Sequence, residues 1–250
     1  MLLGHATGFH AHMWLPVVRE LGAHFHCYAW DARGHGASGP PASADYDWRR
    51  SGDDARAVAG AFGLGRPHGA GHSAGAAAMV LAEADHPGSF GALWLYEPVV
   101  PDWSAMGGDN PLVAGALRRR DRFASREDAR QRLAAKPPFS MFTPEEVELY
   151  VAYGMVDDGA GGVTLACRRE DEARTYEGAV TADPRRRLAE VGVEAYVVAG
   201  TGRSEARPPA LAEAAELLPH GHFAVLEGLS HFGPFEDPAA IAASIVAALG

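Results

Sequence analysis

Residues 66–78 read RPHGAGHSAGAAA. A short strand-like segment runs through a G-x-S-x-G motif into an alanine-rich stretch, which is the context of a serine nucleophile on a sharp strand-to-helix turn. Gly71 and Gly75 stand two positions either side of Ser73, where a Cβ atom would collide with neighbouring backbone. The motif predicts that Ser73 presents its hydroxyl to a pocket, and that the amide of Ala74 faces a developing oxyanion from the helix start.

The same residues also fit a second motif. Gly69, Gly71 and Ala74 match the G-x-G-x-x-A form of the dinucleotide-binding fingerprint, and Glu97 stands near the position of its acidic residue. That fingerprint usually opens the first strand–helix unit of a sheet, whereas two strand-like segments precede residue 66. A nucleotide-binding oxidoreductase is therefore the less favoured interpretation.

Short apolar runs alternate with amphipathic alanine-rich stretches along the chain, a pattern typical of the α/β class with a mostly parallel sheet flanked by helices. The expected strands are Met1–His5, Phe25–Asp31, Arg66–His72, Phe90–Tyr96, Val193–Ala199 and His222–Glu227. The expected helices are Trp14–Leu21, Tyr46–Phe62, Ser73–Asp85, Ala210–Leu217 and Pro238–Leu249.

Between residues 98 and 190 this alternation stops. Two polar-faced helices are expected there, Asn110–Ala135 and Pro144–Tyr153. The chain is therefore expected to build one core from residues 1–97 and 191–250, with a helical insertion at 98–190.

The charge balance limits the partners. The 250 residues include 22 Lys and Arg against 32 Asp and Glu, a formal net charge of −10, which argues against nucleic acid and anionic membranes because both bind cationic fields. A small-molecule substrate is therefore the expected partner.

Cys27 and Cys167 are too few for a disulfide framework and are expected to be reduced. The N-terminal residues do not resemble a signal peptide and no apolar run reaches about 18 residues, which predicts a cytoplasmic location.

Twelve histidines offer candidate ligands and bases. Six of them form three H-x-H pairs, but no carboxylate or third histidine stands at a fixed spacing, so no metal or other cofactor is expected. His231 differs because it follows the last expected strand, in the loop before the C-terminal helix. Ligands meet open parallel sheets at this carboxyl edge, so His231 is the candidate base for Ser73.

Four motifs, in the correct order, resemble those of the α/β-hydrolase family. Residues 71–75 (GHSAG) match its nucleophile motif, and residues 230–238 (SHFGPFEDP) resemble the segment that carries its histidine. Residues 31–38 (DARGHGAS) are similar to its D-x-R-G-H-G-x-S loop, and residues 7–14 (TGFHAHMW) to its H-G-F…W segment. The resemblance covers nearly the whole chain and implies an α/β-hydrolase fold in which residues 98–190 form a helical lid.

The resemblance also implies roles for single residues. Ser73 would be the nucleophile and His231 the general base, while the backbone amides of Phe9 and Ala74 would form the oxyanion hole. Most members place the triad acid after the seventh strand, where this sequence has Arg203.

Two carboxylates are candidates for the missing acid. Glu97 ends an earlier strand, a position from which some relatives, such as haloalkane dehalogenases, take their acid. Glu205 stands slightly late in the loop after the seventh strand. Glu97 is favoured because a strand-end residue holds the histidine tautomer better than a residue in a glycine- and proline-rich loop, and Glu205 remains the alternative.

The beginning of the sequence also departs from the family pattern. Members usually have two antiparallel strands before the one that starts here at Met1, so the fold is either a compact sheet of six parallel strands or begins upstream. Without those strands, Phe25–Asp31 becomes an exposed edge through which the chain is liable to dimerise or aggregate. The protein is therefore expected to be a monomer or a homodimer.

These observations predict a serine hydrolase that acts on an ester, lactone or thioester through an acyl-enzyme. A non-catalytic ligand-binding protein on the same fold is the alternative, because the expected aspartate is missing.

Overall fold

The computed structural model describes residues 1–105, 110–202 and 208–250. Its main sheet has six strands in the order β2-β1-β3-β4-β8-β9, and all neighbouring pairs are parallel. The strands are β1 (Leu2–Gly4), β2 (Tyr28–Trp30), β3 (Gly69–His72), β4 (Leu93–Tyr96), β8 (Ala195–Gly200) and β9 (Gly221–Leu226). Each overlaps one of the six expected strands, which confirms the α/β fold class, and β2 lies at one edge of the sheet.

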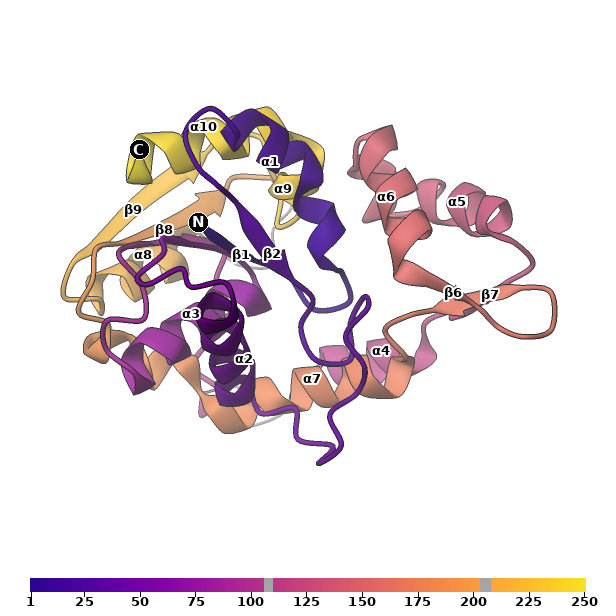
Figure 1. The fold of residues 1–250 in the computed structure, drawn as a ribbon, viewed down its shortest axis with the longest axis horizontal. Coiled ribbons are helices and arrows are strands. Elements are labelled where there is room, and N and C mark those ends of the chain that lie inside the picture. Colours follow the sequence, from indigo (N-terminus) through magenta and orange to yellow (C-terminus); the bar gives the residue numbers. More distant parts are fainter. Residues whose placement is uncertain (106–109, 203–207) are drawn as a thin grey trace.

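Helices cover both faces of this sheet (Figure 1). One face carries α1 (Leu15–Leu21), which packs against α10 (Pro238–Leu249). The other carries α2 (Trp48–Ala61), which packs against α3 (Ala74–Asp85), together with α8 (Pro208–Glu216). Two further elements are short, the 3₁₀ helix η1 (Ala11–Trp14) and α9 (Gly233–Glu236).

Strand β4 shows why both faces are apolar. Leu93 and Leu95 belong to the core beneath α3 and α8, whereas Trp94 and Tyr96 belong to the core beneath α1 and α10. All four side chains are fully buried, because successive residues of a strand point to opposite faces and helices cover both.

The segment between β4 and β8 lies partly in a lobe beside the sheet and partly along α2 and α3 (Figure 1). Its helices are α4 (Leu112–Arg118), α5 (Arg126–Ala134), η2 (Phe139–Met141), α6 (Pro144–Gly154), α7 (Arg169–Ala182) and η3 (Pro184–Glu190). A small antiparallel sheet joins β5 (Arg122–Phe123), β7 (Val163–Leu165) and β6 (Met155–Asp157) in that order. We refer to residues 98–190 as the insertion.

The expected single helix Asn110–Ala135 is wrong. The chain leaves α4 at Arg119, whose backbone is extended, and then pairs Arg122 and Phe123 with β7. It re-enters a helix at Ser125, whose side chain accepts a hydrogen bond from the Asp128 amide and so caps α5. The break places Arg119 between two helices, where its side chain turns toward the core.

An apolar cluster joins the insertion to the core. It contains Phe139, Phe142 and Tyr150 of the insertion together with Phe9 and Phe235 of the core, all of them buried. Among the described helices, none is long and apolar enough to cross a lipid bilayer.

Candidate active site

Ser73 lies on the turn between β3 and α3, with φ 55° and ψ −114°. This positive φ is rare for a residue with a side chain and is held only where the surroundings enforce it. Both flanking glycines are needed. A Cβ atom on Gly71 would lie 2.4 Å from the Cα atom of Ala76, and one on Gly75 would lie 2.4 Å from the carbonyl of Gly4. The sharp turn expected from the motif is therefore present.

Ser73, His231 and Glu97 lie in one hydrogen-bonded row. Nε2 of His231 lies 3.1 Å from Oγ of Ser73, and its Nδ1 lies 2.8 Å from Oε2 of Glu97. The Glu97 side chain is fully buried at the carboxyl end of β4, and its Oε1 accepts a hydrogen bond of 3.0 Å from the amide of Gly200. With Nδ1–H donated to Glu97, Nε2 is free to accept the proton of the Ser73 hydroxyl.

The loop that carries His231 is held by side chains that the sequence analysis missed. Tyr96 Oη donates to the carbonyl oxygen of Ser230 at 2.6 Å, and Glu236 accepts from the Ser230 amide at 2.8 Å. The ring of His72 donates from Nε2 to the carbonyl oxygen of His231 at 2.7 Å. Burial holds the pKa of His72 well below its usual range, so this ring is neutral.

The two expected oxyanion donors differ. Ala74 is the first residue of α3, so its amide has no acceptor within the helix and is available to a ligand. The Phe9 amide instead donates to the carbonyl oxygen of Ala6 at 3.2 Å, in a loop that Gly8 turns with φ +83°. This bond is at the long end of the normal range.

The alternative acid, Glu205, lies outside the described residues. Arg33 and His35 make internal contacts within their own loop and to α2. The Arg33 guanidinium binds both carboxylate oxygens of Asp54 at 2.8 Å, and His35 donates from Nδ1 to the carbonyl oxygen of Arg33. Across the described parts of the chain, no three His, Cys, Asp or Glu side chains come together as a metal site.

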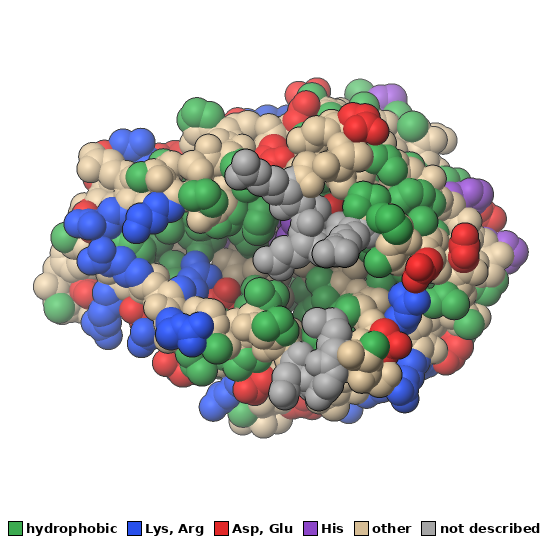
Figure 2. All heavy atoms as spheres, turned by 180° about the vertical axis from the view of Figure 1, so that it is seen from behind, with side chains coloured by type: hydrophobic (Ala, Val, Ile, Leu, Met, Phe, Trp, Pro, Cys, Tyr) green, Lys and Arg blue, Asp and Glu red, His purple; other side chains and the backbone are tan. Residues whose placement is uncertain are grey.

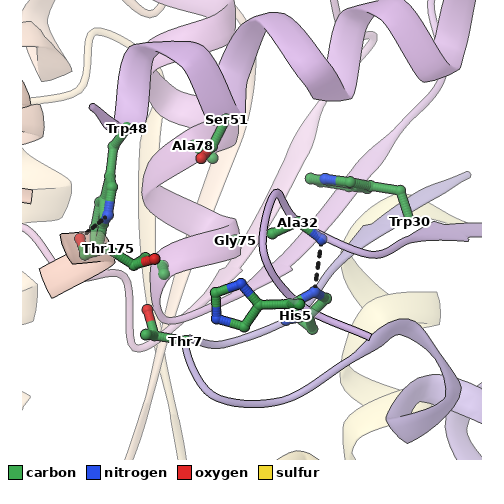
Figure 3. Close-up of a pocket in the computed structure, with 11 residues that line it drawn as sticks. His5, Thr7, Trp30, Ala32, Trp48, Ser51, Gly75, Ala78 and Thr175 are labelled. Carbon is green, nitrogen blue, oxygen red and sulfur yellow. Dashed lines mark hydrogen bonds between the residues drawn. The ribbon is translucent and has the colours of Figure 1, made fainter. Parts of the chain in front are cut away.

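A small cavity of about 20 Å³ lies behind the loop of residues 5–9 (Figure 3). Its wall includes Ala74 and the side chains of Thr7, Trp30 and His35. Each of these three side chains buries a polar atom that has no hydrogen-bond partner among the described residues. The volume suits about one water molecule, and burial lowers the pKa of His35 to about 4, so its Nε2 is an acceptor.

A hollow lined by hydrophobic side chains opens on the face shown in Figure 2. Basic side chains gather over the insertion on the left of that view. The aromatic rings nearest to the ring of Phe9 are those of Phe235 and Tyr150, whose centroids lie 4.7 and 5.6 Å from it. These rings form an apolar wall beside Phe9.

One ion pair of the insertion reaches the same loop. Arg119 donates from Nη1 to Glu172 at 2.6 Å and from Nη2 to Tyr150 Oη at 2.8 Å. A Cβ atom on Gly8 would lie 2.9 Å from a Glu172 oxygen and 3.3 Å from Arg119 Nη1. Because residue 8 has no side chain, this ion pair can lie against the loop of residues 5–9.

Comparison with known proteins agrees with the fold. The model of the alpha/beta hydrolase family matches residues 1–244, so the chain belongs to that family. No curated protein sequence matches it.

Several solved structures with the same fold are hydrolases. An E-2-(acetamidomethylene)succinate hydrolase is 22% identical with a TM-score of 0.87, over 100% of this chain and 90% of that one. The thermophilic esterase from Thermogutta terrifontis is 19% identical, with a TM-score of 0.74 over 98% and 87%. The enol-lactonase from Burkholderia xenovorans LB400 is 21% identical, with a TM-score of 0.71 over 99% and 90%.

Proposed function

We propose that the protein is a serine hydrolase that cleaves an ester-like carbonyl substrate through an acyl-enzyme. The observation that carries this proposal is the row in which His231 bridges Ser73 and Glu97, at 3.1 and 2.8 Å. Such a row supplies a nucleophile, a base and a group that fixes the base's tautomer. Esterases, lactonases and thioesterases among the structural relatives are consistent with it.

The first half of the reaction acylates the enzyme. His231 Nε2 takes the hydroxyl proton of Ser73 as Oγ bonds to the substrate carbonyl carbon, and the carbonyl electrons move to oxygen. When the tetrahedral intermediate collapses, the bond to the leaving group breaks and His231 returns the proton to that group. Water then repeats the sequence on the acyl-enzyme, releasing the acid and restoring Ser73.

The oxyanion would be stabilised by the Ala74 amide and, once its bond to Ala6 is shared or given up, by the Phe9 amide. Residues 98–190 would act as a lid, because their aromatic side chains pack against Phe9 and Phe235 beside the nucleophile. Covering this region would exclude water from the developing charge.

The surroundings of the glycines do not favour the nucleotide-binding oxidoreductase. A pyrophosphate needs backbone that it can approach closely, but the space beside Gly71 is filled by the backbone of Ala76 and that beside Gly69 by Leu93. Glu97, its expected ribose ligand, faces His231 instead.

The test is hydrolysis of 4-nitrophenyl acetate by the wild type and by Ser73→Ala, with fluorophosphonate labelling of both. We expect activity and labelling in the wild type and neither in Ser73→Ala. Wild-type turnover in the variant would refute the nucleophile assignment. A folded wild type that neither reacts nor is labelled would instead favour the non-catalytic binding protein.

A further inference from the structure

The insertion brings one guanidinium to the loop of residues 5–9, which carries the proposed oxyanion donor Phe9. Arg119 lies against Gly8, the residue before Phe9, and is one of eight Lys and Arg between residues 118 and 136, a stretch with only three Asp and Glu. Its neighbours in this run lie on the surface, whereas the Arg119 side chain is only 23% exposed. The break between α4 and α5 is what turns it inward.

The partners of Arg119 fix its orientation without using all of its donors. A guanidinium has five N–H groups, and Glu172 and Tyr150 each accept from one of them. Glu172 and Tyr150 are themselves buried, so they hold the guanidinium in place. These two partners leave three of the five N–H groups unused. A guanidinium needs two N–H groups to bind a carboxylate in a bidentate manner.

The residues around Arg119 indicate which kind of ligand its guanidinium would bind. The Phe9 amide is the expected contact of the scissile carbonyl oxygen. Arg119 lies against Gly8, the residue before Phe9, and the Cα atoms of such neighbours are about 3.8 Å apart. A small molecule whose carbonyl oxygen meets the Phe9 amide would therefore be able to place a second group near Arg119. The neighbouring rings of Phe9 and Tyr150 provide contacts for its apolar part.

We propose that Arg119 binds a carboxylate of the substrate, so that the enzyme acts on esters or related carbonyl derivatives of small organic acids that carry a second, free carboxylate. The proposal rests on the proposed serine-hydrolase function and names its substrate class. Glu172 is the residue that positions Arg119.

The test compares esters that differ in charge but hardly in shape. Wild type, Arg119→Met and the double variant Arg119→Met/Glu172→Gln are assayed with 4-nitrophenyl hydrogen glutarate and with neutral 4-nitrophenyl pentanoate. Arg119→Met alone leaves the carboxylate of Glu172 buried without its partner, which could prevent folding. The double variant removes both charges and avoids this problem. Arg118→Met is the matched control, because Arg118 is exposed at the end of α4.

We expect the wild type to prefer the anionic ester. Loss of Arg119 should lower kcat/KM for the anionic ester by about 10- to 100-fold more than for the neutral one, mainly through KM, because a charge-assisted contact in the ground state is lost. Arg118→Met should keep the wild-type ratio. A ratio that Arg119→Met leaves unchanged, or a wild type that prefers the neutral ester, would overturn the proposal.

Two further measurements separate the possible failures. Glutarate should slow fluorophosphonate labelling of Ser73 in the wild type but not in either Arg119 variant, a readout that needs no turnover.

The pair 4-acetoxybenzoate and 4-acetoxybenzamide moves the charge to the leaving group. A larger effect of the Arg119 variants on this pair would place the substrate carboxylate in the leaving group. If no ester is cleaved and Ser73 is not labelled, the proposed function itself has failed. If both esters are cleaved with the same ratio in all variants, only the substrate class is wrong.

Discussion

Glu97 and His231 lie 134 residues apart in the chain, and their side chains meet at 2.8 Å between Oε2 and Nδ1. The other oxygen of Glu97 accepts from the amide of Gly200, at the end of β8. Strand β8 precedes the loop in which most members of the family place their acid. In this chain the end of β8 supplies a backbone donor that orients a carboxylate from β4.

Replacing Glu97 by Gln should lower kcat by about 10³- to 10⁴-fold, because an amide of the same shape can hold His231 in the wrong tautomer. The measurement is kcat/KM for 4-nitrophenyl acetate, with the circular dichroism spectrum recorded to confirm folding. The matched control is Glu205→Gln, which should keep near-normal turnover. The reverse result, with Glu97→Gln active and Glu205→Gln inactive, would move the acid to the loop after β8.

Features of the fold and site that depend on nearby residues could be predicted from the sequence, whereas those that depend on contacts between distant residues could not. The six strands and the elbow at Ser73 follow from local patterns, namely short apolar runs and the spacing of two glycines. The choice between Glu97 and Glu205 stayed open because it depends on a contact across 134 residues, which no local pattern records.

The insertion was less predictable for the same reason. Strand β5 has two residues, and its partner β7 is about forty residues further on, so neither shows a strand period. One local signal was present, the Ser125-to-Asp128 capping pattern in the middle of the expected helix. Helix α7 was not expected from the sequence. Its first turn buries Asp171 and Glu172, which pair with Arg168 at the N-cap of α7 and with Arg119 at the end of α4, and these two contacts are not visible in the local pattern.

Replacing Gly71 by Ala should disrupt the elbow. The new Cβ would lie 2.4 Å from a backbone atom of Ala76, which cannot move without shifting the start of α3. We expect kcat/KM to fall by at least about 10-fold and Tm to fall by several degrees, since overpacking typically costs about 1–3 kcal/mol. Gly115→Ala is the control, because Gly115 lies in α4 with open space around it, and alanine there should keep or raise Tm. Equal Tm values and activities for the two variants would contradict the crowding at Gly71.

Replacing Tyr96 by Phe tests the support of the His231 loop. The Ser230 carbonyl would lose its 2.6 Å donor, which should cost about 1–3 kcal/mol in unfolding free energy. Because His231 is then less well placed, kcat should fall while KM changes little. Tyr28→Phe removes a tyrosine hydroxyl from strand β2 instead, and should leave kcat and KM unchanged. A stability loss without a change in kcat would assign Tyr96 a purely structural role.

Glu146 gives the molecule a pH-dependent stability. Its side chain is fully buried in the first turn of α6, and both carboxyl oxygens lack a hydrogen-bond partner among the described residues. Thr143 and Glu146 have the spacing of a capping box, but the Thr143 amide donates to the carbonyl oxygen of Phe235 instead. Burial, with a smaller effect of Glu145, raises the pKa of Glu146 to about 9, so this carboxyl is protonated at neutral pH.

The direction of the pH effect follows from this raised pKa. Between the ordinary glutamate pKa of about 4.3 and the folded-state value of about 9, the folded protein binds one more proton than the unfolded chain at this site, so stability falls as pH rises. Glu146→Gln removes this dependence. Its unfolding free energy relative to wild type should therefore increase by up to about 1.4 kcal/mol per pH unit between pH 5 and pH 8, measured by urea unfolding. Glu145→Gln, at an exposed neighbour paired with Arg19, should show no comparable trend. A difference between Glu146→Gln and wild type that stays constant across this range would mean that the carboxyl ionises normally in the folded protein.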